Sequence, residues 1–362
     1  MPSLAKRDGH PAEFASFHLL RWRSRVYALI ALAVLVIPVV VLAVSMGSTE
    51  IPFSTTAKIL VSKLPFVSIS HTWPGPVETA IVDIRLPRVL LAAMAGAALS
   101  VAGATYQGLF RNPLADPYLL GVAQGAGLGA VGGFMLNLGW NGWGLGLIPM
   151  LAFIGGLAAA FFVYYLGRVG RTLPMTTLLL AGVALGAFLS AITAYLALSS
   201  GDSLHGIYSW LWGGFSSPKW IQVKVMLPLV TLGVFTIWLY GQHLNVMQLD
   251  EEQAQQLGIN VERTKRILLL AATLVTAAAV CFGGVIGFVG IIIPHAVRLL
   301  WGPDYRFLLP LSTAAGAIFL ILADLLARTA LSPEEIPLGI ITAFFGAPFF
   351  LYLLRQKKRA VF

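Results

Sequence analysis

Charged residues are scarce in this chain of 362 residues. Only 11% are Asp, Glu, Lys or Arg, whereas 58% are hydrophobic, and a water-soluble domain has roughly 25% charged residues. A surface with so little charge must lie against lipid or against other apolar segments. The composition therefore excludes a cytosolic enzyme, a secreted disulfide-stabilised domain and a disordered tail, and it indicates a membrane protein.

Cysteine is nearly absent, and so are the motifs of several catalytic and metal sites. The single cysteine, Cys281, excludes a disulfide within the chain and a thiolate metal site. No GxxxxGK(S/T) loop is present, so the chain does not hydrolyse ATP by that route. The six histidines show no HExxH spacing, there is no GxSxG, and no two carboxylates share an apolar segment. We therefore expect no catalytic residue, metal or cofactor on this chain.

Ten apolar runs lie along the sequence, each bounded by charged residues, proline or glycine. They cover about residues 26–46, 88–110, 118–137, 148–167, 175–198, 222–241, 266–282, 288–301, 308–328 and 338–354. Because roughly 20 apolar residues cross a bilayer, the runs predict an all-α membrane bundle of ten transmembrane helices after a segment over residues 1–25. The eighth run is short and contains Pro294. Nine crossings with a re-entrant segment are therefore the alternative.

The basic residues are distributed unevenly between the connecting segments. An even number of crossings places both termini on one side, and that side has seventeen of the 24 basic residues. The other seven are Lys58, Lys63, Arg85, Arg88, Lys219, Lys224 and Arg328. Since Lys and Arg are enriched in cytoplasmic loops, we predict that both termini are cytoplasmic. The net charge of +9 then reflects topology, and no nucleic-acid partner is expected.

Two connecting segments are long enough to have structure of their own. Residues 47–87, on the outer side, contain an amphipathic stretch at 57–61 that either contacts an external partner or lies on the membrane surface. Residues 242–266, on the inner side, contain Asp250 and Gln253 at the spacing of a capping box. They predict a short helix ending near Gly258, with Ala254 and Leu257 on one face, and a second short helix from residue 260. So short a helix is unstable alone, and it packs either on its own spans or on another protein.

One pair of opposite charges lies inside an apolar run. Asp324 and Arg328 are four residues apart in the ninth run, so they lie on one face of a helix and can neutralise each other. Charges inside a membrane are costly and mark functional candidates. The pair is either a local neutralising contact or part of a docking site for a partner. A single pair does not make a proton relay, which weakens the case for an ion-coupled secondary transporter.

Small residues and a weak repeat indicate how the bundle is built. The second run has a small residue every four positions from Ala92 to Ala104, which lets neighbouring helices approach closely. We expect this helix to be central. Asp116 and Asp304 open the third and ninth runs with similar sequences. The similarity indicates an internally duplicated core made of spans two to five and seven to ten.

A series of ordered motifs resembles one transporter family. The first half has Arg85-Leu-Pro-Arg88 and Arg111-Asn-Pro-Leu-Ala-Asp-Pro117, and the second half has Pro294-His295, Ala323-Asp-Leu-Leu-Ala-Arg328 and Gly346-Ala-Pro348. These motifs, over about residues 50 to 356, resemble the FecCD family of bacterial ABC-importer permeases. The resemblance covers most of the chain.

The resemblance implies a function and a set of partners. It implies a permease domain over residues 26–362 in the bacterial cytoplasmic (inner) membrane, surrounded by lipid and working as a homodimer. Two ATPase subunits, which bind ATP and magnesium, and a periplasmic or lipid-anchored binding protein would complete the importer. The cargo would be a metal chelate, with a ferric siderophore as the leading expectation and cobalamin or haem as alternatives. The fifth and tenth spans would line the path.

The resemblance also assigns roles to particular residues. Binding-protein docking falls to Arg85, Arg88 and Arg328, and a cytoplasmic gate falls to Met175, Thr176 and Thr177. Met175 departs from the small polar residue of the cobalamin permease at that position. Coupling to the ATPase falls to a segment over about residues 248–264, at Asp250, Glu251, Ala254, Leu257 and Gly258. The rival functions are an ion-coupled secondary transporter and a membrane scaffold or receptor.

Overall fold

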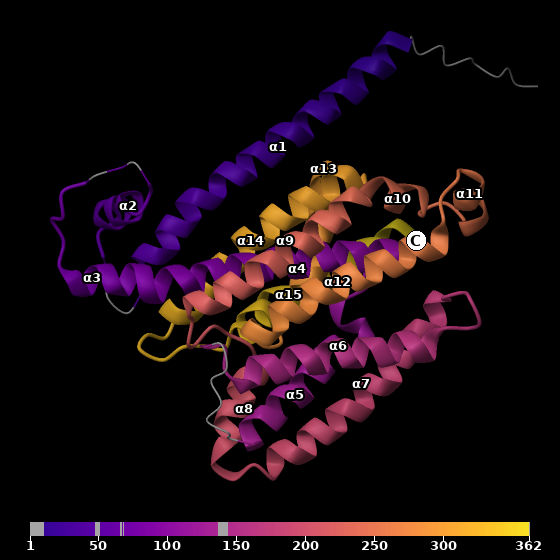
Figure 1. The fold of residues 1–362 in the computed structure, drawn as a ribbon. Coiled ribbons are helices and arrows are strands. Elements are labelled where there is room, and N and C mark those ends of the chain that lie inside the picture. Colours follow the sequence, from indigo (N-terminus) through magenta and orange to yellow (C-terminus); the bar gives the residue numbers. More distant parts are fainter. Residues whose placement is uncertain (1–10, 48–50, 66, 68, 137–143, 362) are drawn as a thin grey trace, which may run out of the picture.

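The chain folds almost entirely into helices. The computed structural model describes residues 11–47, 51–65, 67, 69–136 and 144–361, with their side chains between residues 22 and 351. Within these ranges the regular elements are helices, apart from an isolated bridge between Val169 and Thr172. The helices gather into one bundle from which the first helix projects (Figure 1). The all-helical class predicted from the sequence is confirmed.

Seven of the described helices are long and apolar enough to cross a membrane, and three apolar ones are shorter. The long ones are α1 (Pro11–Ser45), α4 (Leu86–Leu109), α6 (Leu147–Gly167), α7 (Met175–Leu198), α9 (Trp220–Leu239), α12 (Val261–Gly283) and α14 (Tyr305–Thr329). The shorter ones are α5 (Val122–Leu136), α13 (Val289–Trp301) and the apolar part Leu338–Leu351 of α15 (Leu338–Val361). These ten helices follow the order of the ten predicted runs. A multi-pass membrane bundle is confirmed, while ten crossings and the side of each terminus remain predictions.

Short helices occupy the connecting segments. The segment before α4 contains α2 (Phe53–Ser62), α3 (Gly75–Thr79) and a π-helical turn, η1 (Ala80–Arg85), which runs directly into α4. The remaining short elements are η2 (Pro117–Leu120), η4 (Gly201–Ser203), α8 (Leu204–Leu211), α10 (Gly241–Val246) and α11 (Glu251–Gln256). The second predicted span is thus the end of one continuous helical stretch that begins at Gly75. Residues 1–10 of the predicted N-terminal segment lie outside the described residues.

The central position predicted for α4 is confirmed. This helix packs against α9, α12, α13 and α14, and most of its residues are buried. A Cβ at Gly96 would overlap the backbone of Gly316 in α14, and a Cβ at Gly103 would overlap the backbone of Gly290 in α13. The small residues of α4 therefore let two neighbouring backbones come into direct contact.

The two aspartates that mark the predicted repeat both cap a helix. The side chain of Asp116 accepts a hydrogen bond from the backbone N–H of Tyr118 at 2.8 Å, and Asp304 accepts one from Arg306 at 3.1 Å. Each thereby satisfies a donor that a helix start leaves without an intrahelical partner. The starts of η2 and α14 are therefore alike in local structure. The duplication of the whole core remains a prediction.

The segment over residues 242–266 differs from its prediction in three details. Helix α11 is present, but the Asp250 side chain accepts no capping hydrogen bond, because it pairs with Arg111 at 3.5 Å. Ala254 is fully buried whereas Leu257 is 64% exposed, so these two residues do not share a face. The predicted second short helix is instead the start of the long α12, which Asn260 caps. A buried stripe continues from Val261 in this first turn to Leu268 and Ala272 within the bundle, so the helix runs on without a break.

Candidate functional site

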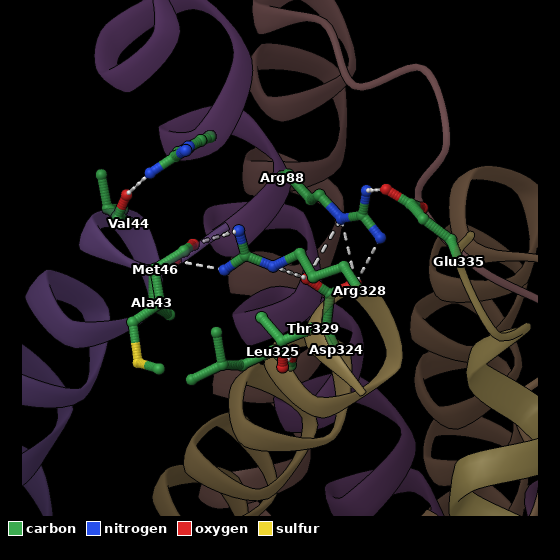
Figure 2. Close-up of polar contacts among 10 residues, drawn as sticks. Ala43, Val44, Met46, Arg88, Asp324, Leu325, Arg328, Thr329 and Glu335 are labelled. Atoms are coloured by element: carbon green, nitrogen blue, oxygen red, sulfur yellow. Dashed lines mark hydrogen bonds and ion pairs between the residues drawn. The ribbon is translucent and has the colours of Figure 1, made fainter. Parts of the chain in front are cut away.

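A cluster of five charged residues lies where the start of α4 meets the end of α14. It consists of Arg85 and Arg88 at the start of α4, Asp324 and Arg328 in α14, and Glu335 in the loop before α15. We call it the arginine cluster (Figure 2). Arg88 donates from Nε to both carboxylate oxygens of Asp324 at 3.0 and 3.1 Å. Its Nη1 donates to Glu335 at 2.8 Å.

The other two arginines of the cluster reach the end of α1. Arg328 donates to the carbonyl oxygens of Ala43 and, at 2.8 Å, of Met46, as Figure 2 shows. Arg85 donates to the carbonyls of Val44 at 3.0 Å and Ser45 at 2.8 Å. The last carbonyls of a helix have no intrahelical partner and carry partial negative charge. Two guanidinium groups therefore terminate α1 and fasten it to the bundle.

Burial makes the charge balance of the cluster important. Arg85 and Arg88 are 8% exposed, Arg328 is 7% exposed and Asp324 is 1% exposed. Charges removed from water must be paired or hydrogen-bonded, and Asp324 serves both Arg88 and, at 3.5 Å, Arg328. The predicted pair of Asp324 and Arg328 is thus part of a larger cluster. The docking role assigned to Arg85, Arg88 and Arg328 remains a prediction.

Helix α11 lies near the opposite end of α4, and two contacts hold its start. Arg111 follows the end of α4 and donates from Nε to the carbonyl of Met247, just before α11, at 2.9 Å. Glu251, the first residue of α11, accepts from Lys265 of α12 at 2.8 Å. Leu249 and Leu257, which flank the helix, are exposed. A short helix in a fixed position thus presents apolar side chains to its surroundings, as a contact with another protein would require.

The predicted gate residues lie at the start of α7. Thr177 donates from its hydroxyl to the carbonyls of Gly167 at 2.7 Å and Pro174 at 2.9 Å, which ties the end of α6 to the start of α7. Thr176 is exposed, and Met175 is half-buried. The connection from α6 therefore has a defined conformation at the place where the gate is expected.

A junction that the sequence did not reveal joins α10 to the start of α14. Asn245 donates to Asp304 at 2.7 Å and accepts from the backbone N–H of Tyr305 at 2.8 Å. Arg25 of α1 lies 3.6 Å from the same carboxylate. Burial raises the pKa of Asp304, but hydrogen bonds from Arg306 and Asn245 outweigh it and hold that pKa below its usual value. Helices α1, α10 and α14 thus meet at one ionised carboxylate.

Metal-binding groups are not assembled in the described part of the chain. Among those residues, no three His, Cys, Asp or Glu side chains are placed to hold a metal ion. Cys281 is buried in α12 with its thiol 3.4 Å from the carbonyl of Ala278.

Comparison with known proteins identifies the bundle. Residues 33–356 match the model of the FecCD transport family. The chain is 43% identical to the cobalamin import permease of Halobacterium salinarum over 88% of this chain and 86% of that protein. It is 38% identical to the hemin transport permease of Yersinia pestis, over 93% of this chain and 98% of that one. These relatives are permeases rather than enzymes.

A solved structure shares the fold. It is described as an inward-facing metal-chelate type ABC transporter, and it superposes with a TM-score of 0.76 at 29% identity. The match covers 91% of this chain and 98% of that chain. A family match over almost the whole bundle, relatives above one-third identity and a common fold agree with one another. The chain is a multi-pass ABC permease that belongs to the FecCD transport family.

Proposed function

We propose that this chain is the membrane-spanning subunit of an ATP-driven importer in the bacterial cytoplasmic membrane, and that it carries a metal chelate inward. The observation that carries the proposal is the family match over residues 33–356. The chain lacks a phosphate-binding loop, so the energy must come from a separate ATPase. Both termini would lie in the cytoplasm, and all ten apolar helices would take part in the crossing.

The ATPase would dock on α11 and its flanks. Asp250, Glu251, Leu257 and Gly258 are exposed, and Ala254 anchors the helix to the bundle from its buried side. Gly258 has a φ of +85°, which a glycine adopts without strain and which turns the chain back towards α12. Burying an exposed leucine in a partner groove contributes about 1.5–3 kcal/mol. Leu257 therefore supports a specific contact.

The binding protein would dock over the arginine cluster. Arg88 is paired partly with Glu335, whose side chain is 47% exposed. A carboxylate of the binding protein can replace Glu335 beside Arg88, because one carboxylate then takes the place of another on the same guanidinium and Arg88 keeps a charged partner. The cluster would thus have two functions. Arg85 and Arg328 hold α1, and the arginines together present positive charge to the binding protein.

A second copy of this chain would complete the path. Helix α7 exposes a row of large apolar side chains, among them Leu180, Phe188 and Tyr195, and α15 exposes Phe344 and Phe345. These are the helices that correspond to the fifth and tenth predicted spans. Their exposed faces fit a homodimer interface with the path between the copies. Transport would be a change of access without covalent chemistry.

We propose cobalamin as the cargo. The sequence alone favoured a ferric siderophore, but the relatives described above are named for cobalamin and hemin, and the cobalamin permease is the more similar of those two. Hemin is the second candidate, since the hemin permease matches over almost its whole length. A ferric siderophore remains the third outcome of the test.

The test is uptake into proteoliposomes that contain the permease, its ATPase and its binding protein. Labelled cyanocobalamin should accumulate only when ATP is supplied, with excess hemin or ferrichrome competing weakly. Uptake of hemin or ferrichrome in its place would reassign the cargo. Uptake driven by an ion gradient without ATPase would indicate a secondary transporter, and binding without any uptake would indicate a receptor or scaffold. Either of these last two results would overturn the proposed function.

A further inference from the structure

Lys265 is a buried lysine that touches three separate parts of the chain. Its side chain is 3% exposed, and its Nζ lies 2.8 Å from Glu251 of α11 and 3.2 Å from Glu262 in its own helix. The same atom donates to the carbonyl of Leu173 at 3.4 Å. By sequence Lys265 is one of many basic residues on the predicted cytoplasmic side. The structure distinguishes it, since a lysine is rarely buried unless it is paired.

The three contacts satisfy the three donors of the ammonium group. A lysine has three N–H donors and no acceptor, and here two carboxylates and one carbonyl surround it. Glu251 is half exposed and Glu262 is one-quarter exposed, so the carboxylates remain hydrated when they are not paired. The lysine is the buried partner, and its position is determined by all three groups together.

The carbonyl that Lys265 holds belongs to the segment just before the predicted gate. Leu173 is buried, and only Pro174 separates it from Met175, the first residue of α7. A proline fixes its own φ and restricts the residue before it. A displacement of the Leu173 carbonyl therefore passes directly to the start of α7. Glu251, at the other side of the lysine, is the first residue of α11.

We propose that Lys265 is the positioning residue that links the ATPase-docking helix to the gate. When the ATPase moves α11, Glu251 moves with it, and the ammonium group transmits the displacement to the Leu173 carbonyl and so to Met175, Thr176 and Thr177. Arg111 holds Met247 and Asp250, just before α11, to the end of α4, so the start of α11 is the point where its motion reaches both α4 and α12. This inference rests on the proposed function and adds a specific residue to it.

The variant Lys265→Met tests the link. Methionine keeps an unbranched apolar stem of similar length but has no ammonium group, so the packing around α12 is retained. Arg263→Gln is the matched control, because Arg263 lies half a turn away, is exposed, and has no side-chain hydrogen bond or ion pair among the described residues. Lys265→Arg restores the positive charge and the donors. Each variant is assembled with its ATPase in lipid nanodiscs.

The readout is the distance between the gates of the two copies in the dimer. A spin label is attached to a cysteine placed at Thr176 on a Cys281→Ala background, and distances are measured without nucleotide and with ATP bound. We expect the nucleotide-dependent change in the unsubstituted background, in Arg263→Gln and, at least partly, in Lys265→Arg. In Lys265→Met the change should be lost. In the same variant, the rate of ATP hydrolysis by the assembled complex should stay within about twofold of the rate in the unsubstituted complex. The amount of cyanocobalamin transported per ATP should fall at least about fivefold, which is the low end of measured allosteric coupling factors.

The outcomes separate this inference from the proposed function. If the unsubstituted complex binds no ATPase or shows no nucleotide-dependent distance change, the proposed function fails. If that complex responds and Lys265→Met responds equally, the role of Lys265 is refuted. If Lys265→Met loses the response because the assembled complex itself is lost, thermal unfolding shows it, and Glu251→Gln then decides. This variant leaves the lysine in place and must also reduce the gate response, and a full response would refute the link.

Discussion

Asp324 is the residue on which the arginine cluster depends. It is almost fully buried between Arg88 and Arg328, and the same arginine side chains hold Glu335 and the end of α1. Removing one partner of a buried ion pair leaves a charge without compensation, which costs about 3–5 kcal/mol. The stability of the cluster is therefore concentrated in one carboxylate.

The substitution Asp324→Asn tests that dependence. Asparagine keeps the shape but removes the negative charge between two arginines, so we expect the free energy of unfolding to fall by about 3–5 kcal/mol. The measurement is unfolding by denaturing detergent, or the midpoint of thermal unfolding in mild detergent. Asp83→Asn is the control, because Asp83 is exposed near the same end of α4. Equal stability of the two variants would show that Asp324 does not hold the cluster together.

Glu335 offers a separate test of docking. If a carboxylate of the binding protein competes with Glu335 for Arg88, then Glu335→Gln should remove the competitor while Asp324 keeps its pairing with Arg88, and docking should tighten about two- to fivefold, as for the loss of one competing ion pair. The measurement is the dissociation constant of the binding protein for the permease in nanodiscs at low salt. Glu334→Gln, at the neighbouring position, is the control. Unchanged or weaker binding in Glu335→Gln would argue that Arg88 does not receive the binding protein.

At the scale of single residues, the sequence predicted what local spacing determines. Asp324 and Arg328 are one helical turn apart, so their pairing follows from helix geometry. Arg88 and Asp324 are 236 positions apart, and no local pattern relates them. The contacts of Lys265 with Glu251 and Leu173 were missed for the same reason, since a lysine at the end of an apolar run ordinarily indicates topology alone.

At the scale of elements, close packing of backbones fixes the crossing of α4 and α14. A Cβ at Gly316 would overlap both Ser100 and the backbone of Gly96. The substitution Gly316→Ala must therefore push the two helices apart and lose their contact. We expect destabilisation by about 1–3 kcal/mol, as for overpacked cores, measured by thermal unfolding in detergent.

Gly132 in α5 is the matched control for that substitution. A Cβ at Gly132 meets nothing within 4 Å, and alanine is favoured over glycine in a helix by up to about 1 kcal/mol. Gly132→Ala should thus be neutral or slightly stabilising. A similar loss of stability in both alanine variants would show that the α4–α14 contact adds nothing beyond general helix packing.

The elements themselves were predicted better than their ends. Apolar runs located all ten apolar helices, because runs of this length have few alternatives in a membrane. The ends depend on partners far away in sequence. Asp250 pairs with Arg111 instead of capping α11, and α4 starts as a continuation of α3 and η1.

At the scale of the whole molecule, topology remains to be measured. The uneven distribution of basic residues predicts that α11 lies in the cytoplasm and the start of α4 on the opposite side. On a Cys281→Ala background, a cysteine at Asp83 should react with an impermeant thiol reagent in intact spheroplasts. A cysteine at Glu252 should react only after the membrane is opened. The reverse pattern would invert the orientation and exclude the assigned docking sides.

The whole-molecule arrangement could be predicted only by resemblance. Composition established a membrane bundle, and the ordered motifs then led to the family, which the comparisons confirmed. Nothing in the sequence pattern indicated that α1 projects from the bundle, as Figure 1 shows. Its attachment depends on Arg85 in η1 and Arg328 in α14, together with its own Arg25, which binds Trp301 and Asp304.

The attachment of α1 has a consequence for how the chain is made. Arg328, which donates to the carbonyl of Ala43, lies 285 positions after it. Trp301, whose carbonyl accepts from Arg25, lies 276 positions after Arg25. At a synthesis rate of about 5–20 residues per second, these two anchors follow the first helix by roughly 14–60 s, whereas Arg85, 41 positions after Val44, follows it by about 2–8 s. During that time Arg85 can already hold the carbonyls of Val44 and Ser45, while those of Ala43 and Met46 still lack Arg328. The first helix is thus fastened in two stages, early by Arg85 and late by Arg328 and Trp301.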